Sequence, residues 1–581
     1  MAKMIFSNNK NGMLLLLSML HLLFMHYFFY LNGYLEWTWL YSEIVNLCSV
    51  VFDVFILISI FLFIFGGRLR PAIILTYIIT FLWSFVNVVY GRFFFQYMSL
   101  SAIGEAQGLG DGLVINSVLS AFHWYDLFYL LSFLCFAVLC RGIKPIRLQM
   151  KSSLRLLLIP VLSLIITFLS YSAYHFIHPH YRNNWDLFAF RAKEFLFDSV
   201  RGGTPNLAHF QTGCVRVSMF EIYDMFKVTE LNSEQKKDIF SFYKKSAMRT
   251  THHQRNPEIR NVIFVLLESF LSAPIDMKVD GKEITPFLNS LKRDSNVYYN
   301  GLMKSDIGCG ESGDGQFIYM TGILPLRHKM TVGQVKNNTL PALPKVLKKK
   351  FGIKHTEIIY PTAPNLWQQA DMNIVYGIAD AFSIENIVGS NTASINDEKI
   401  FAFASRSLNK FKEPFFSLIL SVSMHSPYDH YYGEDYLAGN NEYSTEYKNY
   451  LNTCHYTDSQ LKSYFEIMKR NDLFDSSLII IAADHYAHLD MLKNPQNITD
   501  HTPLFIINGG FDKNKAWSGE CHQLDVYTTI LDVLNIESDW KGLGHTLLSA
   551  EFVNSVTDEA SRVSQMIIEG DYFGIKRNCL Q

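Results

Sequence analysis

The sequence has 581 residues, which is too long for one ordinary domain. Its formal net charge of -2 is too close to neutral for a general nucleic-acid binder. Aromatic residues make up 15% of the chain and hydrophobic residues 49%, and almost all the long apolar runs fall before residue 175. Runs of this length are typical of membrane segments. We therefore expect a membrane domain at 1–175, a juxtamembrane connector with amphipathic helices at 176–260 and an outer domain at 261–581.

Five apolar runs near the N-terminus have about the length that a helix needs to cross a bilayer. They are Met13–Leu31, Val45–Phe65, Pro71–Tyr90, Trp124–Cys140 and Leu156–Tyr174. Lysine and arginine residues cluster before the first run, after the second, and between the fourth and the fifth. By the positive-inside rule these three segments are cytoplasmic. The sequence thus predicts five transmembrane helices, a cytoplasmic N-terminus, and an extracytoplasmic location for everything after residue 175.

Two features of the chain receive no assigned role from the sequence. Asp53 and Asp126 fall inside or at the edge of predicted spans, where an ionisable group either has a function or makes an interhelical hydrogen bond. Five cysteines lie after the membrane runs, and because their number is odd at least one is free or pairs between chains. Their pairing stays open: Cys214, Cys309, Cys454, Cys521 and Cys579.

From residue 261 onward, short apolar runs alternate with amphipathic helical segments. This pattern predicts a doubly wound, mainly parallel α/β domain. The expected strands are Asn261–Ser269, His355–Pro361, Phe415–Ser423, Ser477–His485 and Thr502–Gly509.

Carboxylate and imidazole side chains stand at the ends of three of these expected strands. Glu268 closes the first, His425 follows the third, and Asp484-His485 closes the fourth. Taken singly, each has an ordinary explanation as a helix cap or a loop residue. Open α/β sheets bind ligands beyond the carboxyl ends of their strands, and Asp, Glu and neutral His are common ligands of zinc or manganese. Their coincidence at one edge predicts a divalent-cation site.

A glycine-rich segment, GCGESGDGQF at Gly308–Phe317, places Ser312 before a short apolar helix. Glycines let backbone N–H groups approach an anion, and a helix N-terminus adds positive potential. A serine at such a position is a candidate nucleophile, because a metal ion can lower the pKa of its hydroxyl. The alternative is a flexible loop without chemistry.

The order of NVIFVLLES, ITPFLNSL, GESGDGQF, SVSMHSPY and ADHY, preceded by five apolar runs, resembles one branch of the sulfatase/alkaline-phosphatase superfamily. That branch comprises the lipoteichoic acid synthases and the membrane-oligosaccharide glycerophosphotransferases, and the resemblance covers nearly the whole chain. It implies a sulfatase-like catalytic domain at 261–581 in a protein of the bacterial cytoplasmic membrane. The implied activity is metal-dependent transfer of a phosphoglycerol headgroup from a phospholipid, phosphatidylglycerol, to a cell-envelope glycan or glycolipid.

The resemblance also implies roles for individual residues. Ser312 matches the nucleophile that forms a covalent intermediate, and Glu268, Asp484 and His485 match the metal ligands, with the Ser312 oxygen completing the set. We expect one divalent cation, with Mn²⁺ favoured over Zn²⁺ or Mg²⁺.

The same resemblance assigns substrate contacts to two further residues, His425 and Trp367. Where the family's synthases often carry an arginine two residues after this tryptophan, the chain has Gln369. The phosphate charge must then be met elsewhere, by His425, Arg327 or Lys304. For the general acid, His425 and His501 are the candidates.

Three other functions stay open at this point. A phosphoethanolamine transferase acting on an envelope glycan or a lipid A-like acceptor would use the same metal and nucleophile. A metal-dependent phosphodiesterase would use water as acceptor, and a catalytically inactive binding module would catalyse no transfer. The Cys/Ser-x-Pro/Ala-x-Arg motif of true sulfatases is missing from GESGDGQF, so sulfate-ester hydrolysis is not expected.

Overall fold

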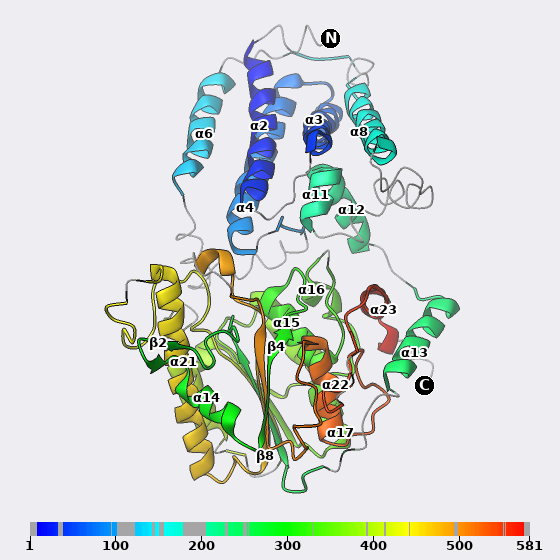
Figure 1. Ribbon diagram of the computed structural model, residues 1–581. Coiled ribbons are helices and arrows are strands. Elements are labelled where there is room, and N and C mark those ends of the chain that lie inside the picture. The colour runs from blue at the N-terminus through cyan, green and yellow to red at the C-terminus, as the bar shows by residue number, and fades with distance from the viewer. Residues whose placement is uncertain are drawn as a thin grey trace. The chain divides into compact units, whose positions relative to one another are not determined.

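In the computed structural model the chain forms two compact units, each described by itself (Figure 1). The N-terminal unit contains the described residues up to Phe226 together with Arg327 and Lys329, and the C-terminal unit contains the others. The structure describes residues 9–32, 39–94, 96–100, 123–141, 146–149, 156–177, 205–226, 230–247, 253, 255–327, 329–390, 393–408, 410–411, 414–440, 442–492, 498–549, 551 and 553–574.

The N-terminal unit is helical. Three segments are long and apolar enough to cross a membrane, namely Lys10–Leu31, Glu43–Ile64 and Leu69–Arg92, which confirms the first three expected spans as helices. Helices also form at the fourth and fifth positions, but their apolar parts are shorter, so the expected count of five spans is not confirmed. The helices are α2 (Asn9–Leu31), α3 (Trp39–Ile64), α4 (Leu69–Phe94), η2 (Trp124–Asp126), α6 (Leu127–Cys140), α8 (Leu158–Ile177), α11 (Pro205–Thr212) and α12 (Cys214–Phe226).

Both acidic residues of the predicted spans bind partners within this unit. Asp126 accepts two hydrogen bonds from the Arg92 guanidinium, at 2.7 and 2.8 Å, in a buried bidentate pair. Asp53 accepts the backbone N–H groups of Cys214 and Val215 at 2.6 and 3.2 Å, which caps the start of α12. These contacts connect helices to one another. They agree with the interhelical hydrogen bonds that the sequence left open as one explanation for these two residues.

The C-terminal unit is built on an eight-stranded sheet in the order β10-β4-β9-β8-β1-β7-β5-β6. Only β9 is paired antiparallel to its neighbours in this sheet, β4 and β8, so the expected mainly parallel sheet is confirmed. The strands are β1 (Asn261–Leu267), β4 (Val297–Lys304), β5 (His355–Ile359), β6 (Asp380–Phe382), β7 (Phe415–Leu420), β8 (Ser477–Ala483), β9 (Thr502–Ile507) and β10 (Cys521–His522), and a separate hairpin pairs β2 (Lys278–Val279) with β3 (Lys282–Glu283).

Helices cover both faces of this sheet, as Figure 1 shows with α14 (Pro286–Arg293) and α21 (Thr445–Arg470) on one side and α15 (Glu311–Thr321) and α22 (Gln523–Val533) on the other. Strand side chains alternate between faces, and every residue of β1 is buried, so β1 contributes alternate residues to two separate cores. The helices are α13 (Ser233–Ala247), α14 (Pro286–Arg293), α15 (Glu311–Thr321), α16 (Thr331–Val335), α17 (Leu343–Lys350), η4 (Leu366–Gln368), α18 (Gln369–Tyr376), α19 (Ile384–Val388), α20 (Asp397–Leu408), α21 (Thr445–Arg470), η5 (Leu489–Leu492), α22 (Gln523–Val533) and α23 (Asp558–Glu569).

The amphipathic helix expected in the connector forms as α13, and it packs on the C-terminal unit. Its Asp238 accepts a hydrogen bond from Arg562 of α23 at 3.2 Å, and Tyr243 stacks on Trp540 with ring centroids 5.4 Å apart. This part of the connector therefore lies on the C-terminal unit, while the domain boundaries at 175 and 260 stay predictions.

The cysteines that the structure describes are all free thiols. Three of them, Cys309, Cys454 and Cys521, are buried in the C-terminal unit, and Cys214 is buried in the N-terminal unit. Cys579 lies outside the described residues.

Candidate active site

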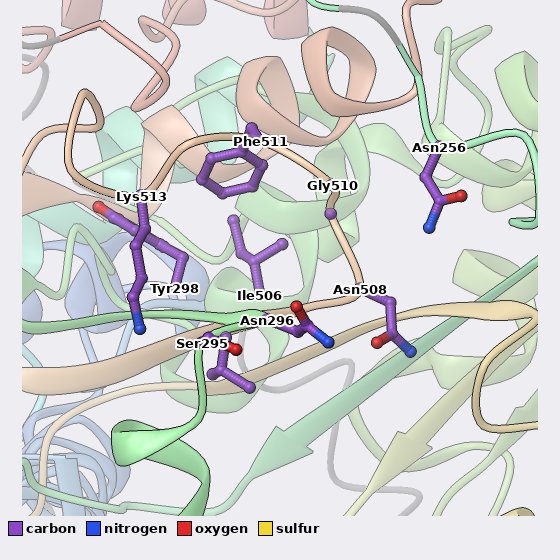
Figure 2. Close-up of a pocket in the computed structure, with 11 residues that line it drawn as sticks. Asn256, Ser295, Asn296, Tyr298, Ile506, Asn508, Gly510, Phe511 and Lys513 are labelled. Carbon is purple, nitrogen blue, oxygen red and sulfur yellow. The ribbon is translucent and has the colours of Figure 1, made fainter.

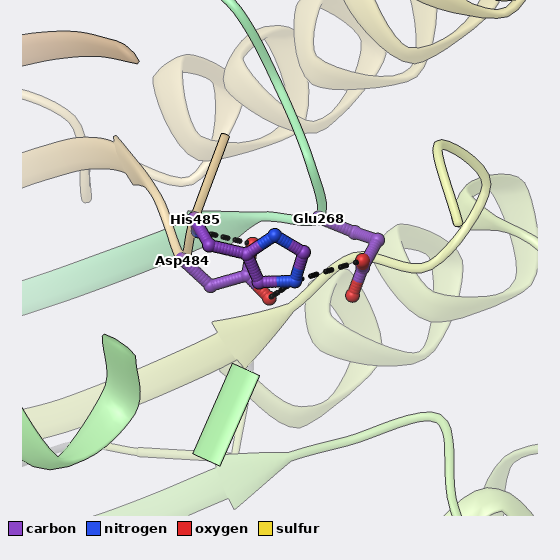
Figure 3. Close-up of side chains that lie close together, drawn as sticks. All are labelled: Glu268, Asp484 and His485. Atoms are coloured by element: carbon purple, nitrogen blue, oxygen red, sulfur yellow. Dashed lines mark hydrogen bonds and ion pairs between the residues drawn. The ribbon is translucent and has the colours of Figure 1, made fainter. Parts of the chain in front are cut away.

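Three of the predicted metal ligands meet because their strands are neighbours. Strand β1 pairs in parallel with β8, and the register puts Leu267 opposite Ala483. The next residues along the two strands are Glu268 and Asp484-His485, so all three side chains leave the sheet at the same edge (Figure 3). Each of the three is at least nine-tenths buried.

The ligand atoms of this triad have the spacing of a metal site. One oxygen or nitrogen from each of Glu268, Asp484 and His485 lies within 4.8 Å of the others. The closest approach to the imidazole is 3.5 Å, from Glu268 Oε1 to His485 Nε2. Two carboxylates and one imidazole form a donor set that suits a divalent cation.

The backbone around His485 prepares its ring for metal binding. Nδ1 lies 2.8 Å from the carbonyl oxygen of Tyr486, so this nitrogen carries the proton and donates it. When a cation is bound, the neutral ring would present the lone pair of Nε2 to it. Asp484 is held in place as well, because its Oδ1 accepts the N–H groups of Ser269 at 3.0 Å and of His485 at 2.8 Å. The residues present therefore fit a divalent cation.

Ser312 completes this cluster from the start of α15. Its Oγ lies 3.3 Å from Glu268 Oε2 and 3.2 Å from His485 Nε2. The preceding residue, Glu311, has a φ of 42°, a left-handed conformation that costs a non-glycine residue about 1–2 kcal/mol. Such strain clusters at active sites, and here it occurs at the turn that presents Ser312 to the triad.

Backbone N–H groups of the glycine loop before Ser312 bind a side-chain carboxylate of the same segment. The carboxylate of Asp314 accepts the N–H groups of Gly308 at 3.0 Å and of Gly310 at 2.8 Å. A Cβ at Gly310 would lie 2.5 Å from Asp314 Oδ1, so any other residue there would displace this carboxylate. Two of the N–H groups expected to meet an incoming anion are therefore already occupied, and the loop's first task is to fix the start of α15.

The charges of the cluster favour a cation at its centre. Burial and the charge of Glu268 raise the pKa of Asp484. Burial alone would lower the pKa of His485, but Asp484, Glu268 and Glu311 together raise it to about 9. The pKa of Glu311 is itself raised to about 7 by burial, against the opposing effect of His485. Several buried carboxylates thus share one imidazolium, and a divalent cation would neutralise them better.

His425 lies at the same edge of the sheet, beyond the end of β7. Burial would raise the pKa of Glu268, but the charges of His485 and His425 hold it below its ordinary value, which places His425 within electrostatic reach of the triad. The Nδ1 of His425 lies 2.5 Å from the carbonyl oxygen of Ser426, so Nε2 is the nitrogen available for a substrate.

The segment that carries His425 depends on a buried carboxylate from α20. Asp397 Oδ1 accepts the N–H groups of Val422 and Ser423 at 2.8 and 3.0 Å, and its Oδ2 accepts the hydroxyl of Thr457 at 2.7 Å. We expect Asp397→Ala to lower the free energy of unfolding by about 3 kcal/mol, because it leaves buried donors unsatisfied. Thermal unfolding in detergent checks this, with the exposed Asp512→Ala as control, and an unchanged midpoint for Asp397→Ala would contradict it.

Trp367 lies in the short helical turn η4, where it is half-buried with a φ of 54°. The neighbouring Gln369 is buried and donates to Gln316 Oε1 at 3.1 Å and to Asn373 Oδ1 at 2.8 Å. Gln316 is four residues after Ser312 on α15. Gln369, which stands where the family's synthases often have an arginine, therefore connects this turn to the helix that carries Ser312. The substrate contacts of His425 and Trp367 stay predictions.

Comparison with known proteins agrees with this geometry. Residues 260–536 match the Sulfatase family model, and residues 1–183 match the model of the Lipoteichoic acid synthase N-terminal domain. Lipoteichoic acid synthase 2 of Bacillus subtilis (strain 168) is 26% identical over 520 residues, which is 84% of this chain and 76% of that protein. Lipoteichoic acid synthase of Staphylococcus aureus (strain USA300) is 24% identical over 524 residues, covering 83% and 75%.

Among solved structures, the lipoteichoic acid synthase LtaP from Listeria monocytogenes matches with a TM-score of 0.42 and 17% identity, over 57% of this chain and 82% of that chain. The chain thus carries a sulfatase-family domain at residues 260–536 and a lipoteichoic acid synthase N-terminal domain at residues 1–183, and it is similar to lipoteichoic acid synthases over most of its length. It is an enzyme of the phosphotransferase class, as its relatives are.

The candidate site also contains residues that the sequence did not single out. Glu311 brings a further carboxylate to within 3.8 Å of His485 Nδ1, and its position beside Ser312 was the available signal. Gln523, at the start of α22, donates to the carbonyl oxygen of Asp484 at 2.7 Å. Nothing local in the sequence connects Gln523 with a strand end 39 residues earlier.

Close packing between α15 and the end of β8 makes Gly315 a sensitive position in this phosphotransferase. A Cβ there would lie 2.0 Å from the carbonyl oxygen of Asp484, so the helix or the strand end must move. We expect Gly315→Ala to reduce the transfer rate about 100-fold and to destabilise the fold by about 1–3 kcal/mol. The matched control is Gly313→Ala, whose Cβ would first meet Val332 at 3.5 Å. Equal transfer rates for the two variants would show that the close contact between Gly315 and Asp484 does not affect activity.

Proposed function

We propose that this enzyme transfers a phosphoglycerol headgroup from a membrane phospholipid, phosphatidylglycerol, to a cell-envelope glycan or glycolipid through a covalent intermediate on Ser312. The observation that carries the proposal is the position of Ser312 Oγ, 3.3 Å from Glu268 Oε2 and 3.2 Å from His485 Nε2 at the start of a helix. The relatives named lipoteichoic acid synthases support the choice of glycerol phosphate.

In the first half of the reaction, Ser312 Oγ attacks the phosphorus of the phospholipid. A bond forms between the serine oxygen and phosphorus as the bond from phosphorus to the diacylglycerol oxygen breaks. That oxygen takes a proton, and diacylglycerol leaves. His425, at the same sheet edge as the triad, is the proposed proton donor, and His501, which comes directly before β9, is the alternative.

In the second half, a hydroxyl group of the acceptor attacks the same phosphorus. The bond between Ser312 and phosphorus breaks, the phosphoglycerol passes to the acceptor oxygen, and the acceptor's proton is returned to the enzyme. A divalent cation, for which we propose Mn²⁺, would be held by Glu268, Asp484, His485 and the Ser312 oxygen. It would lower the pKa of the serine hydroxyl and stabilise charge on the phosphate oxygens by several kcal/mol.

We further propose that the catalytic domain lies outside the bacterial cytoplasmic membrane, held there by the N-terminal helices. Three of those helices are apolar enough to span a bilayer. An enzyme anchored in this way meets its lipid donor at the membrane surface, so the donor never has to leave the bilayer.

The test is a search for the covalent intermediate on the full-length enzyme. The protein is incubated with phosphatidylglycerol or with phosphatidylethanolamine and then digested, and the peptide with Ser312 is weighed by mass spectrometry. We expect a phosphoglycerol adduct on Ser312 with the first lipid. A phosphoethanolamine adduct on Ser312 would show that phosphatidylethanolamine is the donor instead. An adduct on another residue would overturn the mechanism.

A further inference from the structure

A polar cavity lies in the C-terminal unit at the edge of the sheet opposite the metal triad. It has a volume of about 270 Å³, just below the usual range for pockets that bind drug-sized ligands, and eleven residues line it (Figure 2). The lining residues are Asn256, Ser295, Asn296, Val297, Tyr298, Ile506, Asn508, Gly509, Gly510, Phe511 and Lys513.

Strand direction fixes the position of this cavity. Val297 begins β4 and pairs with Ile507 at the end of β9, and Ile507 in turn pairs with Ile479 near the start of β8. The triad residue Asp484 follows the other end of β8. At about 3.3 Å per residue the cavity and the triad are separated by about 20 Å, so the cavity is no part of the catalytic centre.

Amide and hydroxyl groups dominate the cavity wall. The side chains of Ser295 and Asn296 are exposed and make no hydrogen bond to other described residues. Asn508 donates through Nδ2 to the carbonyl oxygens of Phe474 and Ser477, at 2.8 and 3.1 Å. These two bonds use both N–H groups of the Asn508 amide and fix it in the cavity wall, which leaves its oxygen as the group that a ligand could use.

The remaining wall provides an aromatic surface and a tight turn. Phe511 lies with its ring centroid 5.8 Å from that of Tyr298, and Tyr298 is fixed by a 2.6 Å hydrogen bond to the carbonyl oxygen of Trp517. Gly510 has a φ of 72°, and a Cβ there would come within 3.0 Å of Asn256. Glycine at this position lets the Asn256 segment close the cavity.

The charge of the cavity excludes strongly charged ligands. Lys513 is the one ionisable residue among those that line it, apart from the phenol of Tyr298, and its ammonium already donates to the carbonyl oxygen of Asp294 at 2.7 Å. A phosphate group would need more positive charge than this. A fatty acyl chain would leave the amides without partners, which is costly.

We propose that this cavity binds one neutral sugar unit of a glycan, as a second site for the acceptor. Sugar hydroxyl groups both donate and accept hydrogen bonds. The Asn296 amide can meet them in both ways, the Asn508 amide can accept through its oxygen, and the apolar face of a sugar ring can pack on Phe511. The choice of a glycan rests on the proposed function. Because about 20 Å separates the cavity from Ser312, only an acceptor of several sugar units reaches both.

The experiment measures sugar binding directly on the full-length chain in a detergent without a sugar headgroup. Methyl glycosides of glucose, galactose and N-acetylglucosamine are titrated and followed by saturation-transfer NMR and calorimetry. We expect binding of at least one glycoside, weakened about tenfold or more by Asn296→Ala and also weakened by Ser295→Ala. Asn514→Ala, on the same loop but outside the cavity wall, should bind as the unchanged protein does.

Three results would overturn the proposal: no binding of any of the glycosides, equal binding by Asn296→Ala and the unchanged protein, or displacement of the sugar by inorganic phosphate. The variant Ser312→Ala tests sugar binding independently of the proposed transfer reaction. It should bind the glycoside normally, because Ser312 is remote from the cavity. A missing Ser312 adduct with intact sugar binding would therefore count against the transfer mechanism alone.

Discussion

Replacing Ser312 by alanine should abolish phosphoglycerol transfer, with a rate loss on the order of 10⁴ or more. Ser312 Oγ is the proposed nucleophile, and it lies within 3.3 Å of two proposed metal ligands. Removing a nucleophile that acts together with its activating groups costs nearly the whole catalytic advantage of the group. The measurement is release of diacylglycerol from labelled phosphatidylglycerol by the full-length enzyme.

Two further variants make this result specific. Ser312→Thr keeps a hydroxyl at the same position and should retain measurable activity. Ser290→Ala removes an exposed hydroxyl on α14 and should leave the rate unchanged. If Ser312→Ala still released diacylglycerol at the rate of the unchanged enzyme, the covalent mechanism would be wrong, and direct attack by the acceptor or by water would replace it.

The sequence predicted the central strands well because their burial is nearly complete. β1 and β8 each have one polar residue followed by six apolar residues, all of them buried, and short apolar runs of this kind favour a central strand. Strand β4 was missed, because VYYNGLMK contains Asn300 and Gly301 and is only partly buried. β6 and β10 have three and two residues, too few for any periodic signal.

The site residues could be predicted only where they directly follow a recognisable strand. Glu268, Asp484 and His485 could be placed together because each directly follows a central strand, and strand ends in a parallel sheet meet at one edge. Asp314 could not, since only the folded loop shows that its carboxylate turns back onto Gly310. The apolar pattern of the fourth and fifth membrane runs located helices, but pattern alone does not determine whether a helix spans the bilayer.

Removing divalent cations should also abolish most of the activity of the enzyme. The triad brings two carboxylates and an imidazole within 4.8 Å of one another, at least nine-tenths buried, and without a cation the two carboxylates repel each other. We expect chelation to reduce diacylglycerol release by about 10³-fold or more, because the cation supplies several kcal/mol of charge stabilisation. Added Mn²⁺ should restore the rate, and Zn²⁺ and Mg²⁺ tested in parallel decide the identity of the ion.

Direct binding distinguishes loss of the cation from damage to the fold. Mn²⁺ at 100 times its Kd should stabilise the chelated enzyme by about 2.7 kcal/mol, visible as a higher unfolding temperature. Glu268→Gln and His485→Ala should lose both this stabilisation and the activity, because each removes a ligand of the triad. Ser312→Ala should keep most of the stabilisation and lose only the activity. An enzyme that works at full rate with no bound metal would refute the assignment of the triad, whereas stabilisation without rescue of activity would confine the cation to a structural role.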